Sequence, residues 1–82
     1  MQQRMTVEYK DVCLKAGEAM PLPKFAGSLH IAPKINCDAT VCVGDEKIIV
    51  KDEVISVRSA DILTVQSGNL YADLRFEAEL SI

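Results

Sequence analysis

Hydrophobic and polar positions alternate along the C-terminal part of the chain. The even positions from 70 to 80 hold Leu70, Ala72, Leu74, Phe76, Ala78 and Leu80, and the odd positions between them hold Tyr71, Asp73, Arg75, Glu77 and Glu79. Successive side chains of a strand point to opposite faces of a sheet, so this pattern predicts a strand with one face on a core and the other in water. A helix would scatter the same apolar residues around its whole circumference.

A turn cluster precedes this strand. Ser67-Gly68-Asn69 contains two residue types that tolerate the positive φ of tight hairpin turns. The segment before it, residues 62–66, is rich in residues that favour strands. The sequence therefore predicts a hairpin whose two arms are residues 62–66 and 70–80.

Shorter strands are expected upstream of this hairpin. Residues 54–59 alternate, and they could continue into the next strand through a bulge near Ala60-Asp61. Residues 39–43 and 47–50 are separated by a segment that begins with Gly44-Asp45, which suits a tight turn. These two strands are predicted to form a second hairpin.

The N-terminal stretch 6–14 alternates less regularly. Its apolar residues form two sets, Met5, Val7 and Tyr9 on one face and Val12 and Leu14 on the other. An extra residue in a strand moves all later side chains to the opposite face, so this inversion predicts a bulge near Lys10-Asp11.

The segment between residues 17 and 32 is harder to interpret. Gly17 to Pro23 contains one glycine and two prolines and is expected to be a loop. Residues 24–31 alternate as a strand does, whereas the spacing of Phe25, Leu29 and Ala32 also fits a short helix. Gly27, Ser28 and Pro33 weaken that helix, so the strand is preferred.

Six to seven short strands, separated by turns, predict an all-β fold. Such spacing is typical of a small antiparallel sandwich or a partly open barrel. The chain has 82 residues, of which 49% are hydrophobic and 26% charged, so residues 1–82 are expected to form a single β domain. Its only aromatic residues are two Phe and two Tyr, which leaves Val, Ile and Leu to build the core.

Charge and hydropathy argue against two classes of partner. The net charge is −3, and no cluster of Lys or Arg supplies the basic face that phosphate contacts need, so no nucleic-acid partner is expected. No apolar stretch approaches the length of a membrane span, and residues 1–10 carry charges where a signal peptide needs an apolar run. We therefore expect no membrane partner and a cytoplasmic location, or a virion if the protein is phage-encoded.

The residues that could carry chemistry are few. Cys13, Cys37 and Cys42 match no zinc-binding spacing with the only histidine, His30, although the four could still meet in space. The cysteines are expected to be three reduced thiols, with one disulfide plus a free thiol as the alternative. A Cys/His dyad of Cys37 or Cys42 with His30 is a weaker hypothesis than a buried apolar role.

No other pattern indicates catalysis. The acidic pairs lie in expected turns or on a solvated strand face, at Asp45-Glu46, Asp52-Glu53 and Glu77/Glu79. The four glycines are isolated and form no phosphate-binding loop. The sequence therefore predicts no enzyme, no cofactor and no metal site, and places His30 on the solvent face of a strand beside Ser28.

The stretch from Ala32 to Asp38, followed by Lys51, resembles part of the HPr family of phosphocarriers, and the chain length also fits that family. The resemblance covers about a quarter of the chain and implies amphipathic helices. Where that family carries its phosphorylated histidine and a neighbouring arginine, this chain has Pro21 and Pro23, and Asp52 replaces the regulatory serine. The resemblance thus implies at most a phosphotransfer-dead relative.

The function that the pattern favours is a non-enzymatic structural or protein-interaction module. The long C-terminal strand has little Pro or Lys to prevent pairing, so we expect it to be an edge strand that self-associates or adds to another subunit. Its exposed face would contribute Tyr71, Asp73, Arg75, Glu77 and Glu79 to the interaction. Small β subunits of phage particles and adaptors are an analogy by size and class.

Two alternatives remain open. A small-ligand-binding barrel would have to bind at its rim, where the Gly17–Pro23 loop lies beside Glu18 and Lys24, because a short barrel is filled by its own side chains. An enzyme or a cryptic metal protein would use the three cysteines with His30.

Overall fold

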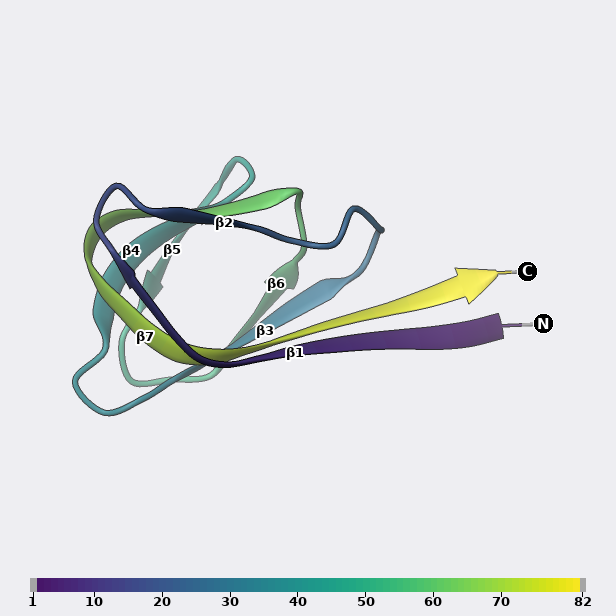
Figure 1. The fold of residues 1–82 in the computed structure, drawn as a ribbon, viewed down its shortest axis with the longest axis horizontal. Helices are drawn as coiled ribbons and strands as arrows, with labels where there is room; N and C mark the ends of the chain where they lie inside the picture. The colour runs from purple at the N-terminus through teal and green to yellow at the C-terminus, as the bar shows by residue number, and fades with distance from the viewer. Residues whose placement is uncertain (1, 82) are drawn as a thin grey trace.

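The computed structural model describes residues 2–81, and all of its regular elements are strands (Figure 1). They are β1 (Gln2–Lys15), β2 (Ala19–Pro21), β3 (Ser28–Pro33), β4 (Asp38–Val43), β5 (Glu46–Val50), β6 (Ile55–Arg58) and β7 (Ile62–Ser81). Every ladder between them is antiparallel. The predicted all-β class is therefore confirmed.

β7 is the centre of the sheet. Along one side it pairs with β1 and β2, and along the other with β3 and β4. β5 adds to the free side of β4, and β6 adds to the free side of β3. The path β5-β4-β7-β3-β6 curls into a nearly closed five-strand barrel, and within residues 2–81 its two ends, β5 and β6, share no ladder, which leaves one seam unsealed.

The predicted hairpin turn at Ser67-Gly68-Asn69 is wrong. β7 runs through this cluster as one strand of 20 residues, and Gly68 (φ 74°) bends it instead of reversing it. A bulge beside the bend places Val41 opposite Val65 and Thr40 opposite Ser67. The two halves of β7 therefore do not pair with each other, because each half has its own neighbours on both sides.

The bulge predicted in the N-terminal strand is confirmed. The register of β1 against β7 shifts between Tyr9 and Val12, and Asp11 takes a positive φ of 54°. The extra residue restores the inward direction of the side chains after it. The apolar residues on both sides of the bulge consequently pack against the same core, namely Met5, Val7, Tyr9, Val12 and Leu14.

The interpretation of the middle of the chain is partly confirmed. Residues 28–33 form β3, so the strand is preferred correctly over the helix, although it begins later than expected. The expected loop 17–23 contains the short strand β2, which pairs with the start of β7, and Leu22 is buried. β6 does not continue into β7, because residues 59–61 connect strands that lie apart in the sheet.

The turn expected at Gly44-Asp45 is confirmed as the link between β4 and β5, where Val43 pairs with Glu46. The HPr resemblance does not extend to the fold, because that family requires helices and residues 2–81 contain none.

The barrel interior is filled by aliphatic side chains and one aromatic ring. The largest fully buried side chains are Phe76, Leu29, Ile31, Leu63, Leu70, Leu74, Val41, Val50 and Val65. No polar or charged side chain among the described residues is buried. A barrel of this size is normally filled by its own side chains.

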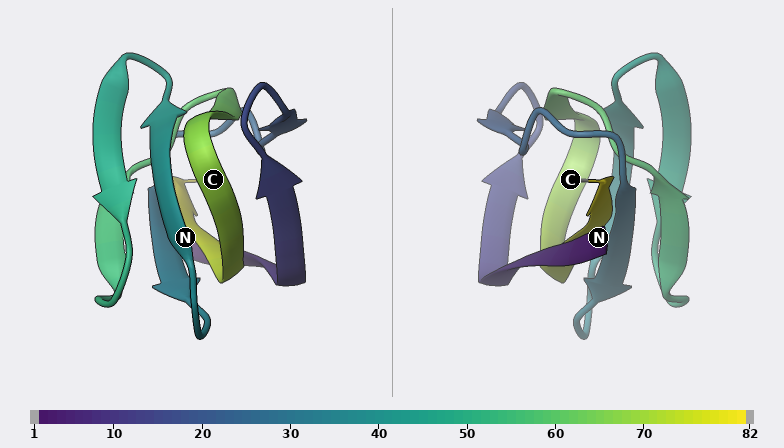
Figure 2. Two further views of the ribbon diagram at one scale, coloured as in Figure 1. Left: turned by 90° about the vertical axis from the view of Figure 1, so that its left-hand side faces the viewer. Right: turned by 90° about the vertical axis from the view of Figure 1, so that its right-hand side faces the viewer.

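The N-terminal part of β1 and the C-terminal part of β7 leave the barrel together as a two-stranded ribbon (Figure 1). The ribbon makes the molecule elongated, with extents of 42 × 23 × 16 Å. Figure 2 shows the strands side by side, with β1 at one margin of the sheet and β5 at the other. No helix within residues 2–81 has the length and apolarity needed to cross a membrane.

Candidate functional site

The structure places the predicted interaction residues on a central strand, which corrects the expectation of a free C-terminal edge. Those residues are Tyr71, Asp73, Arg75, Glu77 and Glu79, and residues 72–77 of β7 pair with β1 on one side and β3 on the other. The in-plane backbone groups of that segment are therefore occupied. Strand addition to it, as the sequence suggested, is not possible without displacing a neighbour.

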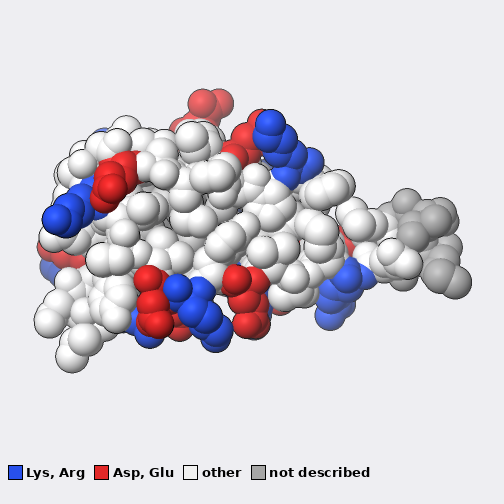
Figure 3. Space-filling model, viewed as in Figure 1, with Lys and Arg blue, Asp and Glu red and all other residues white. Residues whose placement is uncertain are grey.

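The polar face of β7 carries short-range charge pairs with neighbouring residues. Arg4 lies 3.6 Å from Glu79 across the β1–β7 ladder, and Arg75 lies 2.8 Å from Glu77 on β7 itself. Acidic and basic groups are interspersed on the face drawn in Figure 3. Each of these pairs is exposed to solvent and stabilises the fold only slightly.

A lysine and two carboxylates hold the bulge of β1. The Asp11 N–H donates a hydrogen bond to Asp73 Oδ1 (2.8 Å), and the Lys34 ammonium contacts the Asp11 carboxylate and lies 3.7 Å from Asp73 Oδ1. The Lys34 ammonium also lies 5.6 Å from the centre of the Tyr71 ring. This cluster joins the bulge of β1 to β7 and to the β3–β4 connection.

The pKa values of two residues in this cluster, Lys34 and Asp73, are shifted, and the contacts explain the direction of each shift. The hydrogen bond to the Asp11 carboxylate raises the pKa of Lys34, and the hydrogen bond from the Asp11 N–H lowers the pKa of Asp73. Both shifts favour the charged forms. Shifts in these directions are what contacts between opposite charges and a hydrogen bond to a carboxylate produce.

His30 lies between two other strands. Its Nδ1 is 2.6 Å from Ser56 Oγ on β6, and its Nε2 is 3.7 Å from Glu77 Oε2 on β7. The imidazole is partly covered, with 26% of its side-chain surface exposed, so the expected position beside Ser28 on an open face is only partly correct. The order Ser56–His30–Glu77 resembles a catalytic triad in composition.

That arrangement lacks two requirements of a triad. The Glu77 carboxylate is beyond hydrogen-bond distance of Nε2 and is bonded to Arg75 instead. Ser56 lies within the regular strand β6, where successive N–H groups point to opposite sides, so neighbouring N–H groups do not converge on one point as an oxyanion hole requires. The three residues therefore form a polar surface contact.

The cysteines do not converge with His30. Cys13 is exposed on β1, Cys42 is half-buried on β4, and Cys37 is buried, with its sulfur accepting from the Tyr71 N–H at 3.4 Å. All three thiols are free. In the part of the chain that the structure describes, no three His, Cys, Asp or Glu residues gather as metal ligands would.

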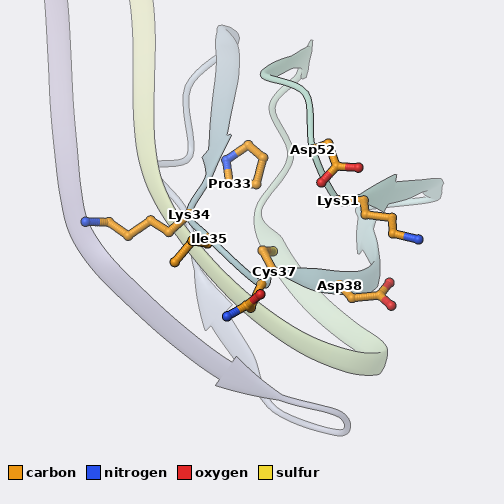
Figure 4. Close-up of a pocket in the computed structure, with 8 residues that line it drawn as sticks. Pro33, Lys34, Ile35, Cys37, Asp38, Lys51 and Asp52 are labelled. Carbon is orange, nitrogen blue, oxygen red and sulfur yellow. The ribbon is translucent and has the colours of Figure 1, made fainter.

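A hollow of about 520 Å³ lies between the β3–β4 and β5–β6 connections (Figure 4). It is lined by Pro33, Lys34, Ile35, Asn36, Cys37, Asp38, Lys51 and Asp52, which include much of the stretch that resembles HPr. The Lys34 ammonium points out of the hollow towards β1, and Lys51 and Asp52 stand on its far wall. The charged groups do not converge on one point, so the hollow has no built polar site.

The rim expected for a small ligand, Gly17–Pro23 with Glu18 and Lys24, is tied into the sheet. Glu18 Oε1 accepts a hydrogen bond from the Lys15 N–H at 2.7 Å, and residues 19–21 pair with β7. The Lys24 side chain is exposed. This segment is a structural connection between β1 and β3.

The feature that sequence reasoning missed is the free side of β1. This strand has 14 residues and pairs with β7 alone. Its start belongs to the projecting ribbon, and no other strand of the described chain pairs with its outer edge (Figure 1). β1 therefore presents the longest open hydrogen-bonding edge of the barrel.

The direction of the backbone groups on β7 follows from one hydrogen bond. The Lys34 N–H donates to the Tyr71 carbonyl oxygen at 2.8 Å, so Tyr71 turns its backbone groups to the side of β3 and β4. In an antiparallel ladder, successive residues turn their N–H and C=O groups to opposite sides. The even residues of β7 therefore bond to β1.

The register then identifies the open groups of β1. Odd residues of β1 face even residues of β7, as Val7 faces Phe76 and Met5 faces Ala78. The backbone N–H and C=O groups of Arg4, Thr6 and Glu8 consequently point away from β7, into the open side.

Comparisons of the chain with protein-family models, with curated proteins and with solved structures gave no match.

Proposed function

We propose that this chain is a non-enzymatic interaction subunit that associates by adding a strand to the free edge of β1. The observation that supports this proposal is the length and position of that edge. Outside its bulge, this strand of 14 residues pairs with β7 on one side only, and its start, Gln2–Met5, lies opposite the part of β7 that extends beyond the β3 ladder. An open edge of this kind is a template for another strand.

The edge carries few of the devices that prevent strand addition. Between Gln3 and Tyr9 there is no proline, no glycine and no lysine, and the one bulge of β1 lies after Tyr9. Thr6, Val7 and Tyr9 are residue types that favour strands. The polar clusters described above offer no competing catalytic assignment.

The apolar side of the ribbon also favours association. Met5, Val7 and Leu80 are only partly buried, although their side chains lie on the same face of the ribbon as the core residues Phe76 and Ala78. A second subunit beside β1 would cover part of this surface. Each Å² of apolar surface removed from water contributes about 25 cal/mol.

The oligomeric state in solution tests the proposal. Sedimentation equilibrium over a concentration series from low to high micromolar is expected to give an oligomer that dissociates on dilution. A monomer throughout that range would refute the proposed function.

Thr6→Pro, compared with Thr6→Val, tests whether the free edge of β1 is the interface. It removes an N–H that points outward, so the β1–β7 ladder loses no bond, and proline is tolerated on an edge strand. The variant should keep the wild-type circular-dichroism spectrum and become monomeric, whereas Thr6→Val, which keeps the N–H, should associate as the wild type does. Equal association of both variants would exclude this edge as the interface.

A further inference from the structure

We infer that the partner at the β1 edge is a second copy of this chain, paired antiparallel about a twofold axis that passes beside Thr6. This inference rests on the proposed function and adds the identity of the partner, the symmetry and the register. It is carried by the charge pattern of β1 together with the direction of its open backbone groups.

Only some registers satisfy the backbone. The outward groups belong to even residues of β1, so an antiparallel copy must place even residues opposite even residues. Registers that oppose even and odd residues would direct the outward groups of one copy at the inward side of the other. They would also bring the charged face of one copy beside the apolar face of the other.

Among the permitted registers centred between Gln3 and Glu8, where β1 has no bulge, one gives attractive charged pairs and no repulsive pair. With Thr6 opposite the partner's Thr6, Arg4 lies opposite the partner's Glu8, and Glu8 lies opposite the partner's Arg4. On the other face, Met5 lies opposite the partner's Val7, and the symmetry repeats this contact. Opposite charges and apolar residues directly across a ladder each stabilise the pairing.

The neighbouring registers either place like charges opposite each other or lose the attractive charged pairs. An axis beside Val7 would oppose Arg4 to the partner's Lys10, and an axis beside Glu8 would oppose two Glu8 carboxylates. An axis beside Met5 would oppose Arg4 to the partner's Thr6 and lose both ion pairs. Like charges directly across a ladder destabilise the pairing, so electrostatics selects the axis beside Thr6.

The backbone contribution is substantial for such a small interface. Arg4, Thr6 and Glu8 each face a residue of the partner whose groups also point into the junction. Each such hydrogen-bonded residue pair exchanges two bonds, so the three pairs give about six backbone hydrogen bonds. The product is a four-stranded sheet in the order β7-β1-β1-β7, with the two barrels at opposite ends.

Charge reversal tests the register. Arg4→Glu places two acidic groups opposite each other twice in the dimer and should raise the dissociation constant roughly tenfold to thirtyfold. Glu8→Arg should do the same with two basic groups. The double variant R4E/E8R exchanges the charges, restores both attractive pairs and should return to within about threefold of the wild type.

Glu79→Arg is the matched control for the first variant. Arg4 also pairs with Glu79 inside one chain, so R4E and E79R both create a like-charge pair within the ribbon. Only R4E changes a pair across the proposed interface. The dissociation constant of the E79R variant should therefore change by less than about threefold.

A covalent trap gives a second measurement that does not depend on charge. In the register about Thr6, position 6 is the one position that faces itself, so Thr6→Cys in a Cys13→Ser background should form an intersubunit disulfide under mild oxidation. Lys10→Cys in the same background faces position 2 of the partner and should not.

The outcomes separate the two proposals. Rescue by R4E/E8R and a disulfide at position 6 support the register. An associating wild type without rescue, or without the disulfide, overturns the register and leaves strand addition at β1 in place. A wild type that is monomeric at every concentration overturns both.

Discussion

Gly68→Ala is predicted to destabilise the protein strongly, because Gly68 combines a left-handed backbone with a close approach of two strands. Its φ is 74°, a value that costs an alanine about 1–2 kcal/mol. A Cβ at this position would collide with the carbonyl oxygen of Asp38 and would lie 3.2 Å from the Ala39 Cα, so β4 would have to move. Overpacking of this kind costs about 1–3 kcal/mol more.

The total is a large share of the available stability. A chain of 82 residues is expected to have a free energy of unfolding of about 4–12 kcal/mol. The two costs sum to about 2–5 kcal/mol, and the loss of chain entropy in the unfolded state on replacing glycine offsets about 0.4–1 kcal/mol of it.

Two other glycines separate these causes. Gly17 also has a positive φ (89°), but nothing lies within 4 Å of a Cβ added there, so Gly17→Ala carries only the backbone cost. Gly27 has no positive φ, but an added Cβ would collide with the Glu77 carbonyl oxygen and lie 2.9 Å from the Phe76 ring, so Gly27→Ala carries only the collision.

Urea unfolding followed by far-ultraviolet circular dichroism measures all three variants, at one protein concentration so that association is constant. Gly68→Ala should lose about 1–3 kcal/mol more than Gly17→Ala. A difference below about 0.5 kcal/mol would refute the reasoning that contact between the bend of β7 and β4 limits this position.

Three further predictions concern the core, the ion cluster and the thiols. Phe76→Ala should lower the free energy of unfolding by about 3–5 kcal/mol because the ring is fully buried, whereas Phe25→Ala, at a half-exposed ring, should cost less than about 1 kcal/mol in the same urea assay. The pKa of Asp73 in the folded state is lowered below 3.8, so its ionised carboxylate stabilises the fold above the pKa of the unfolded chain. This stabilisation is lost as the pH falls through the folded-state pKa. Between pH 5 and about 2.5, the urea midpoint of the wild type should therefore fall more than that of Asp73→Asn. Cys13 should react with a thiol reagent in the native state, and Cys37 should react only on unfolding, as labelling followed by mass spectrometry would record; rapid native labelling of Cys37 would contradict its burial.

The buried face of the second half of β7 could be predicted from the sequence. All even positions of β7 from Leu70 to Ala78 are buried, as their alternation predicted. The bulge at Asp11 was readable for the same reason, because an extra residue inverts the pattern and the inversion appears in the sequence. Both features concern the direction perpendicular to the sheet, in which side chains report burial.

The sequence could not predict that the chain continues through Ser67-Gly68-Asn69 as one bent strand. A glycine with positive φ serves a hairpin turn and a bend within a strand equally well, since both need the same backbone conformation. The choice between them depends on which strands lie beside residues 62–66 and 70–80. Those neighbours, β4 and β1, come from distant parts of the chain.

The polar contacts of the candidate site could not be predicted from the sequence for a related reason. The polar contacts around His30 join three strands, and the ion cluster of Lys34 joins a connection to β1 and β7. Each partner looks like an ordinary solvated residue in its own segment. Only the register of the ladders brings them within reach of each other.

The sequence predicted that the C-terminal strand β7 lies at an edge, whereas the structure places β7 in the centre of the sheet and leaves β1 with the open edge. The alternation of side chains explains this error. Period-2 alternation states which face of a strand is buried, but it contains no information on how many strands lie beside it in the plane of the sheet. The regular pattern of β7 is that of a strand with a clean buried face, and such a strand can be central or marginal. The irregular pattern of β1 records a bulge, and bulges are frequent at sheet margins. In this chain the weaker alternation therefore belonged to the strand with the open edge, and an interface should be sought on β1.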